Sequence, residues 1–177
     1  MLFLMIDLHI HSNASDGQYR PAELVEKACE SGISVLALTD HDTIAGLSEA
    51  AAEAEKRHIT FIRGIEIFVE WPTGEFHLLG LGFTHISPSL RELVDFLQKK
   101  RTERNLRIIE EMREADIDAS YDELCSLFPD SSIGRPHFAE YLKYKKIVKD
   151  NREAFEKYLG KGKPFYAERS GVNLDEA

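Results

Sequence analysis

The sequence has 177 residues, enough for one ordinary domain with a hydrophobic core or for one domain with a small appendage. Hydrophobic residues make up 43% and charged residues 30% of it, which argues against a disordered chain. The formal net charge of -9 argues against a broad basic surface that binds extended DNA, although bound metal ions would still allow an anionic substrate.

The first half of the chain alternates predicted strands with predicted helices. Apolar runs with little alternation are typical of strands that are buried on both faces. Pro21 suits the first turn of a helix and Gly32 suits its end, while an alanine-rich segment favours a second helix. This β-loop-α repeat indicates an α/β protein with a parallel sheet or barrel. The predicted strands span 2–10, 33–38, 59–63 and 75–83, and the predicted helices span 21–31 and 44–57.

The character of the sequence changes after about residue 89. Apolar residues then recur with helical periodicity, and many charged residues lie between them. From Phe165 the chain leaves this helical segment. The predicted helices span 90–113, 121–127, 136–143 and 151–159.

Cysteine use and the opening residues suggest a compartment. Cys29 and Cys125 are far apart in the sequence and form no CxxC pair, which is typical of reduced thiols. The apolar stretch from Met1 to Ile6 is too short for a signal peptide or a membrane span. We therefore expect a cytoplasmic protein that does not bind a membrane.

His9 and His11 place two imidazoles on one side of the first predicted strand, because side chains alternate along a strand with a period of two. Alone, this pair is a weak signal, since a buried histidine is more often a core residue with one hydrogen bond. Further residues of metal-binding type follow at strand ends or in the fourth strand, and parallel strands bring their carboxyl ends together. Mixed imidazole and carboxylate ligands suit zinc, manganese or iron, and more than four ligands imply more than one ion. The candidate ligands are His9, His11, Asp16, His41, Glu66 and His77.

These residues stand in motifs that resemble the polymerase-and-histidinol-phosphatase (PHP) family of metal-dependent phosphoesterases. The order and spacing of the motifs match the family. The sequence most resembles the branch that removes the 3′-phosphate from nucleoside 3′,5′-bisphosphates, whose members can also trim short RNA from the 5′ end. The matching segments are 7–12, 16–17, 38–42, 64–66 and 77–80, followed by 134–137 and 162–165.

The resemblance implies an α/β fold, a distorted (β/α)₇ PHP barrel that is incomplete in this chain and carries an α-helical insertion. Residues 1–89 would form the N-terminal part of the barrel, 90–164 the insertion, and 165–177 the start of the return to the barrel. The family completes its metal site with a further histidine and an Asp-x-His pair, which this sequence does not supply. We therefore expect the N-terminal two-thirds of such an enzyme.

The resemblance also implies two or three divalent ions, Mn²⁺, Zn²⁺ or Fe²⁺, held by the six candidate ligands. Asp16 and His41 would take part in catalysis, and Asp40 would contribute by orienting a neighbouring group. Metal ions activate water and clamp the attacking and leaving oxygens, so hydrolysis of a phosphate monoester needs no serine or cysteine nucleophile. Ser12 and Ser15 are therefore interpreted as hydrogen-bonding residues of the loop.

A second informative segment surrounds Pro136, which suits the first turn of a helix whose N-terminus favours anions. Arg135 could grip a phosphate with two hydrogen bonds, and His137 could add a donor. Lys163 is a further candidate for binding the substrate. The alternative is an ordinary helix N-terminus with solvated basic residues.

Arg101 and Arg104 share one face of the first predicted helix of the helical segment, because residues three apart are neighbours on a helix. We expect this face to be exposed to solvent, with both arginines paired to Glu103 and Glu110.

The leading hypothesis is a hydrolase that removes phosphate from a small phosphorylated metabolite, in particular a nucleotide. A histidinol-phosphate-type phosphatase and an exonuclease that trims RNA ends are alternatives within the same family. A metal-binding fragment with impaired catalysis is the alternative from another class. The oligomeric state is left open.

Overall fold

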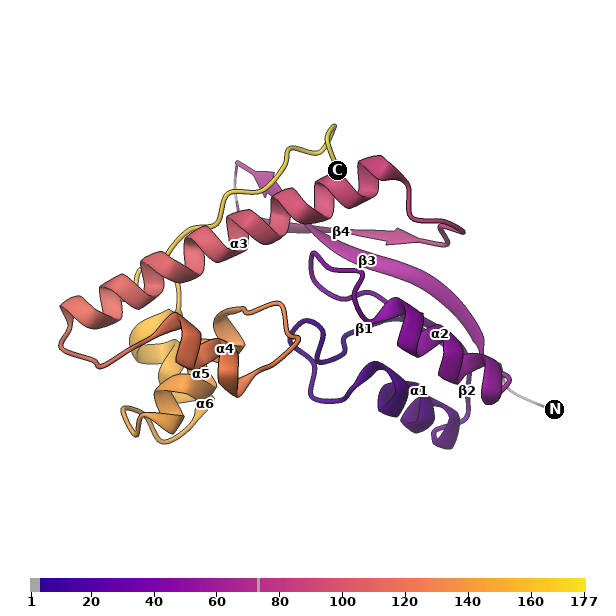
Figure 1. The fold of residues 1–177 in the computed structure, drawn as a ribbon, viewed down its shortest axis with the longest axis horizontal. Coiled ribbons are helices and arrows are strands. Elements are labelled where there is room, and N and C mark those ends of the chain that lie inside the picture. The colour runs from indigo at the N-terminus through magenta and orange to yellow at the C-terminus, as the bar shows by residue number, and fades with distance from the viewer. Residues whose placement is uncertain (1–3, 73) are drawn as a thin grey trace. The chain divides into compact units, whose positions relative to one another are not determined.

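The structure of the protein is a computed structural model that describes residues 4–72 and 74–177. Figure 1 shows the helices and strands along the chain. These elements fall into two compact units. The first contains the described residues up to Gln98 together with Gly171–Ala177, and the second contains Lys99–Ser170.

A four-stranded sheet with the order β1-β2-β3-β4 lies in the first unit. The first three strands run parallel, as the β-loop-α repeat predicts, because a helix connects each strand to the next. The prediction of a parallel sheet is wrong for β4, which runs antiparallel to β3. The strands are β1 (Met5–Ile10), β2 (Ile33–Leu38), β3 (Thr60–Trp71) and β4 (Gly74–Leu81).

The direction of β4 follows from the length of β3. We predicted that the third strand ends at Arg63, but β3 continues to Trp71 and β4 begins again at Gly74. So short a connection forms a hairpin, whereas a parallel crossover needs a dozen or more residues. Glu66 consequently lies within β3 and not beyond its end.

Helices α1 (Pro21–Glu30) and α2 (Leu47–Lys56) connect the parallel strands. α1 begins at Pro21 as predicted, but α2 begins at Leu47 and not at Ile44. The Thr43 hydroxyl accepts a hydrogen bond from the Ala45 N–H group, and this local turn competes with the helix at its predicted start. The buried core between these helices and β2 includes Val25, Ala28, Leu36, Leu38, Leu47, Ala50 and Ala54.

A second cluster in the first unit fixes the β3–β4 hairpin. Val94 and Leu97, from the N-terminal part of α3 (Pro88–Glu114), pack with Ile65 and Ile67 of β3. Val172 joins this cluster, and its carbonyl accepts a hydrogen bond from Glu70 N–H at 2.7 Å. The strand that carries Glu66 is thus held by packing as well as by its neighbouring strands.

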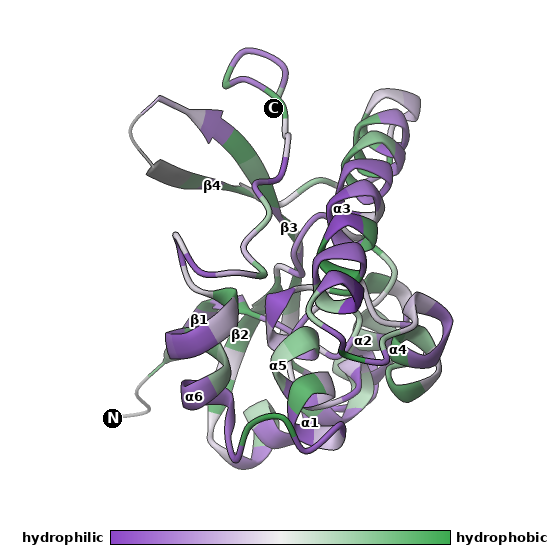
Figure 2. Ribbon diagram, turned by 90° about the vertical axis from the view of Figure 1, so that its left-hand side faces the viewer, coloured by the Kyte–Doolittle hydropathy of each residue, from purple (hydrophilic) through white to green (hydrophobic). Residues whose placement is uncertain are grey.

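The second unit is helical, as predicted. α3 continues into it and displays hydrophobic and hydrophilic residues along its length (Figure 2). A segment predicted as one helix at 151–159 is α-helical and then π-helical. The remaining helices are α4 (Tyr121–Leu127), α5 (Arg135–Tyr144), α6 (Asn151–Ala154) and the π-helix η1 (Phe155–Leu159).

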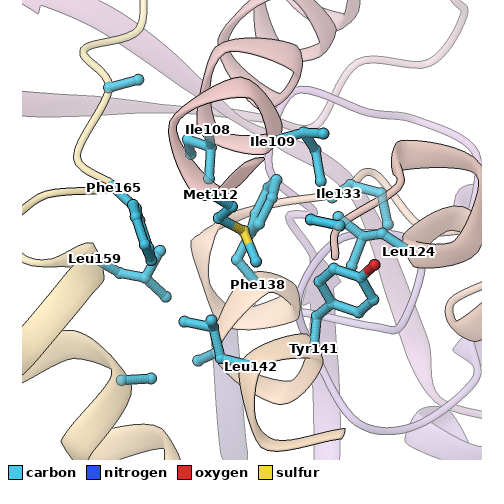
Figure 3. Close-up of a cluster of buried hydrophobic side chains, with 14 of the residues drawn as sticks. Ile108, Ile109, Met112, Leu124, Ile133, Phe138, Tyr141, Leu142, Leu159 and Phe165 are labelled. Carbon is cyan, nitrogen blue, oxygen red and sulfur yellow. The ribbon is translucent and has the colours of Figure 1, made fainter. Parts of the chain in front are cut away.

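A cluster of buried hydrophobic side chains forms the core of this helical unit (Figure 3). Met112 from α3 and Leu142 from α5 are fully buried in it, together with Leu159 and Phe165. The described part of the chain contains no helix that is both long enough and apolar enough to cross a membrane.

Replacement of Leu142 by alanine should lower the free energy of unfolding by about 2–5 kcal/mol, because the substitution leaves a cavity in this core. The same change at Leu106, whose side chain is 49% exposed, should stay within about 0.5 kcal/mol of the wild type. Urea denaturation of both variants measures the difference. Equal destabilisation would contradict the position of the core.

Candidate metal centre

Backbone hydrogen bonds bring the ends of β1 and β2 to the middle of β3. Thr39 N–H donates to the Ile10 carbonyl at 2.9 Å, which carries the pairing of β1 with β2 to the end of both strands. The loop after β2 then forms an isolated parallel bridge between His41 and Glu66. Glu66 N–H donates to the Asp40 carbonyl at 3.2 Å. His41 therefore lies beside Glu66 because the parallel ladder extends past the end of β2.

The antiparallel hairpin supplies another histidine. His77 of β4 pairs with Phe68 of β3, and Glu66 lies two residues before Phe68. Residues two apart on a strand point to the same face, so His77 and Glu66 share one face of the sheet. His77 Nδ1 lies 2.7 Å from Glu66 Oε1.

Four imidazoles surround the carboxylate of Glu66. Its Oε2 atom lies 2.8 Å from His9 Nε2, 3.1 Å from His11 Nε2 and 3.5 Å from His41 Nδ1. Its Oε1 atom faces His77 on the other side. The two oxygens of one carboxylate thus face two different sets of nitrogens.

The electrostatic setting keeps Glu66 charged. Burial acts to raise the pKa of this carboxyl group, but hydrogen bonds from His11, His77 and His9 and the charge of His41 lower it far below its usual range. A carboxylate that is ionised and nearly buried can act as a metal ligand without first losing a proton.

The six predicted ligands form three overlapping groups, and within each group one ligand atom per residue lies within 4.8 Å of the others. Every group shares one residue with each of the other two. The groups are His9, His11 and Glu66; His11, Asp16 and His41; and His41, Glu66 and His77.

The middle group contains a buried nitrogen that no described hydrogen bond satisfies. His11 Nδ1 has no hydrogen-bond partner among the residues that the structure describes, and Asp16 Oδ1 lies 3.8 Å away. Asp16 Oδ2 lies 3.7 Å from His41 Nε2. These separations are too long for hydrogen bonds, but they suit atoms that face a common cation.

The surrounding carboxylates raise the pKa of the His11 imidazole. Burial lowers the pKa of its imidazole, but the hydrogen bond to Glu66 and the negative charges of Asp16, Glu66 and Asp40 outweigh burial and raise it. Its ring stacks on that of His41 with centroids 4.5 Å apart. Two rings in this arrangement direct their nitrogens towards the same carboxylates.

Asp40 lies behind the centre and organises the loop that presents Asp16. Its Oδ1 atom accepts hydrogen bonds from Ser12 N–H at 2.7 Å and from the Ser15 hydroxyl at 2.6 Å. Its Oδ2 atom accepts from the Ser12 hydroxyl at 2.6 Å. Burial raises the pKa of this carboxyl group, although the hydrogen bonds from both serines oppose the rise. The interpretation of Ser12 and Ser15 as loop residues is confirmed.

The same loop passes very close to the end of β1. A side chain at Gly17 would place its Cβ atom 2.1 Å from the His11 carbonyl oxygen. This close approach requires glycine directly after Asp16.

Two residues near the centre were not among the predicted site residues. Asp42 is fully buried and adopts a left-handed backbone conformation with φ of 54°. Gln98 of α3 donates a hydrogen bond to the Asp42 carbonyl at 2.8 Å. The position of Asp42 next to His41 was a usable signal, whereas nothing in the sequence near Gln98 points to this contact.

The three predicted substrate-binding residues lie in the helical unit. His137 is buried, its Nδ1 atom accepts a hydrogen bond from Gly134 N–H at 2.9 Å, and its ring contacts Phe128 edge-on. The Arg135 guanidinium lies over the Tyr166 ring at 5.4 Å, and Lys163 is exposed.

The prediction that Arg101 and Arg104 form a solvated face is wrong, because their side chains are only 7% and 5% exposed. Arg101 donates towards the Ile133 carbonyl, and its Nη1 atom would lie 3.0 Å from a Cβ atom at Gly134. The periodicity of α3 identifies which residues share a face, but the helical unit packs against this face despite its charges.

Comparison with known proteins identifies the family. The sequence profile described as the PHP domain matches residues 7–163. The chain belongs to the PHP domain family. This membership confirms the resemblance that the motifs indicated.

Two relatives of the PHP chain match nearly all of it. The 3′,5′-nucleoside bisphosphate phosphatase of Chromobacterium violaceum is 38% identical over 173 residues, covering 97% of this chain and 61% of the relative. The 5′-3′ exoribonuclease of Haemophilus influenzae is 37% identical over 171 residues, covering 97% and 62%. The chain therefore spans about three fifths of the length of these relatives.

Solved structures support the same fold. A Chromobacterium violaceum protein described as an amidohydrolase matches with a TM-score of 0.88 and 38% identity, covering 97% of this chain and 61% of that one. A protein of Bifidobacterium adolescentis described as a metal-dependent phosphoesterase matches with a TM-score of 0.89 and 25% identity, covering 98% and 61%. The expected α/β fold, an incomplete PHP barrel in this chain, is thereby confirmed.

Asp40→Ala should destabilise the PHP chain by about 2–3 kcal/mol, because Ser12 N–H and two hydroxyl groups lose a buried, charged acceptor. Asp40→Asn keeps an oxygen that accepts from Ser12 N–H, so it should lose less than half as much stability as Asp40→Ala. Thermal unfolding of the two variants without added metal tests this role. Equal loss in both would show that the negative charge, and not the hydrogen-bonded shape, holds the loop.

Proposed function

We propose that this PHP chain carries the metal centre of a phosphoesterase that removes the 3′-phosphate from nucleoside 3′,5′-bisphosphates. The observation that carries the proposal is the Glu66 carboxylate, which has three imidazoles around one oxygen and the imidazole of His77 at the other. Glu66 belongs to two of the three groups of candidate ligands, so it would help to hold the ions. Centres with two metal ions are well suited to phosphate ester hydrolysis.

The described residues fit such ions. Imidazole nitrogens and carboxylate oxygens form a donor set suited to Mn²⁺, Zn²⁺ or Fe²⁺, and three overlapping groups allow two or three ions. The buried His11 Nδ1 atom, which lacks a hydrogen-bond partner among the described residues, is a natural ligand for one of them. The residues that would hold the ions are His9, His11, Asp16, His41, Glu66 and His77.

Divalent ions at such a site supply a water molecule activated at neutral pH and offset the negative charge of the phosphate oxygens. The residues of the chain provide the geometry. Asp16 and His41 face each other across the middle group, where their Oδ2 and Nε2 atoms are 3.7 Å apart. Asp40 acts indirectly, because it holds the loop that presents Asp16 and lies next to His41 in the chain.

The helical unit offers positive charge for an anionic substrate. Arg135 begins α5, where the helix N-terminus also favours an anion. Because His137 Nδ1 accepts a hydrogen bond from Gly134 N–H, the neutral ring carries its proton on Nε2. The proposal assigns Arg135, His137 and Lys163 to substrate binding.

The substrate class is supported by the relatives and by the charge of the chain. One relative is a 3′,5′-nucleoside bisphosphate phosphatase and another is a 5′-3′ exoribonuclease, so a nucleotide or a short RNA end suits both names. The net charge of -9 does not favour extended DNA. The two free cysteines, Cys29 and Cys125, suit a reducing compartment such as the cytoplasm.

The purified chain should hold at least two transition-metal ions, and His41→Ala should lower this number and abolish phosphatase activity. The imidazole of His41 belongs to two of the three ligand groups, so its removal affects more than one ion. Elemental analysis together with release of inorganic phosphate measures both effects.

His85→Ala is the matched control, because His85 is exposed and belongs to none of the three ligand groups. It should leave metal content and activity unchanged. Fewer than one ion per wild-type chain would refute the metal centre, and full activity in His41→Ala would place the reaction elsewhere.

Among phosphorylated substrates, a nucleoside 3′,5′-bisphosphate should give a higher kcat/KM than histidinol phosphate or short RNA. Arg135→Met should lower this kcat/KM by about 10- to 100-fold, because a hydrogen bond between charged groups is lost. Arg152→Met, at an exposed arginine of the same unit, should have no such effect. A preference for histidinol phosphate or RNA would favour one of those activities. Metal binding without turnover of any substrate would favour an impaired metal-binding fragment.

A further inference from the structure

The loop that carries His41 is fixed by a residue that is not itself one of the candidate ligands. Asp42 follows His41 directly, is fully buried, and has a φ of 54°. A left-handed backbone is unfavourable for most residues, but aspartate and asparagine tolerate it better than others. This conformation turns the chain immediately after the His41 side chain.

Hydrogen bonds to β3 and to α3 hold Asp42 in this conformation. Its N–H group donates to the Glu66 carbonyl at 2.8 Å, and its Oδ1 atom accepts from Phe68 N–H at 2.9 Å. Its carbonyl accepts from Gln98 Nε2 at 2.8 Å. The first two bonds attach Asp42 to β3 on both sides of Ile67, and the third attaches it to α3.

Gln98 has a defined position because its own helix is fixed. Leu97 and Val94, one residue and one helical turn before it, are buried against Ile65 and Ile67 of β3. The same strand therefore supports the helix that holds the loop and carries Glu66. A shift of Gln98 would therefore move the carbonyl group of Asp42, the residue directly after His41.

We propose that Asp42 and Gln98 form a positioning pair that fixes His41 relative to Glu66 in the metal centre. This inference rests on the proposed function, because it assigns a role to residues around the proposed ligands. Neither residue is a ligand in the three groups that the described residues form. Groups that orient a ligand in this way commonly change metal affinity by about 10- to 100-fold when they are removed.

A series at Asp42 separates its backbone conformation from its side chain. Asp42→Asn keeps the acceptor for Phe68 N–H and tolerates a positive φ, so it should bind Co²⁺ within about threefold of the wild type. Asp42→Gly keeps the backbone conformation alone and should bind more weakly. Asp42→Ala loses both and should bind about 10- to 100-fold more weakly than the wild type.

Gln98→Met keeps the approximate length of the side chain and removes its N–H donor. It should also weaken Co²⁺ binding by about 10- to 100-fold and shift the visible absorption bands of the bound ion, which report ligand geometry. Asp95→Ala, at an exposed position on the same helix, should change neither quantity. Calorimetric titration and absorption spectra of folded samples provide the two measurements, and unfolding of the metal-free variants provides a third.

Each result decides the proposal. Wild-type Co²⁺ affinity and spectra in Gln98→Met would overturn it, even if that variant were less stable, since a purely structural role would affect stability alone. This variant remains decisive if Asp42→Ala fails to fold. If the wild-type chain bound no Co²⁺, the metal centre would be refuted together with the positioning pair. Wild-type binding with unchanged variants would refute the positioning pair alone.

Discussion

One carboxylate contacts four imidazoles, and this contact depends on the order of the strands in the first unit. Glu66 can receive these groups because β3 has neighbours on both sides, β2 in parallel and β4 in antiparallel orientation. The parallel side brings His41 from the loop after β2, and the antiparallel side brings His77 from within β4. A carboxylate on an edge strand would lack one of these approaches. The mixed direction of the sheet is thus a requirement of the centre and not a departure from an ideal parallel fold.

His41 lies between two buried carboxylates in the sequence, Asp40 and Asp42, and both hold its loop in place. Asp40 holds the loop through Ser12 and Ser15, and Asp42 holds β3 through Phe68 N–H. A buried carboxylate is costly unless hydrogen bonds satisfy it, and each of these accepts at least one bond from a backbone N–H group. Backbone groups move little, so the energy that keeps these charges buried also fixes the loop. His41 consequently has little freedom to turn away from Glu66.

The sequence was sufficient to predict the family and to single out six candidate ligands that the structure brings together, because these residues occur in short motifs whose residue types have few other uses in such a pattern. It was insufficient for the length of β3. The predicted strand stops at Arg63, directly before Gly64, a residue type that weakens the interior of a strand. In the structure, a Cβ atom at Gly64 would lie 2.9 Å from the Leu38 carbonyl oxygen. The glycine marks close contact between two strands and not the end of one.

Contacts between distant segments explain the other differences. The burial of Arg101 and Arg104 depends on the helices that pack around α3 in the second unit, and a helical period cannot reveal what covers a face. Gln98 reaches Asp42 across 56 positions of sequence, and its own neighbours carry no recognisable motif. His137, which we propose for substrate binding, also accepts at Nδ1 a hydrogen bond from Gly134 N–H, three residues earlier. Helix N-termini of this kind combine a local structural role with any role in binding.

The negative charge of the carboxylates at the centre affects how an anionic substrate could bind under the proposed function. Asp16 and Glu66 face the candidate metal positions in a chain whose net charge is -9. By themselves these carboxylates would repel a phosphate. Divalent ions would make the local electrostatic potential positive, because they would be the largest charges in such a site. Under the proposed function, divalent ions held by these residues would offset this charge for an anionic substrate, and the contacts of Glu66 with the imidazoles keep the candidate ligands together.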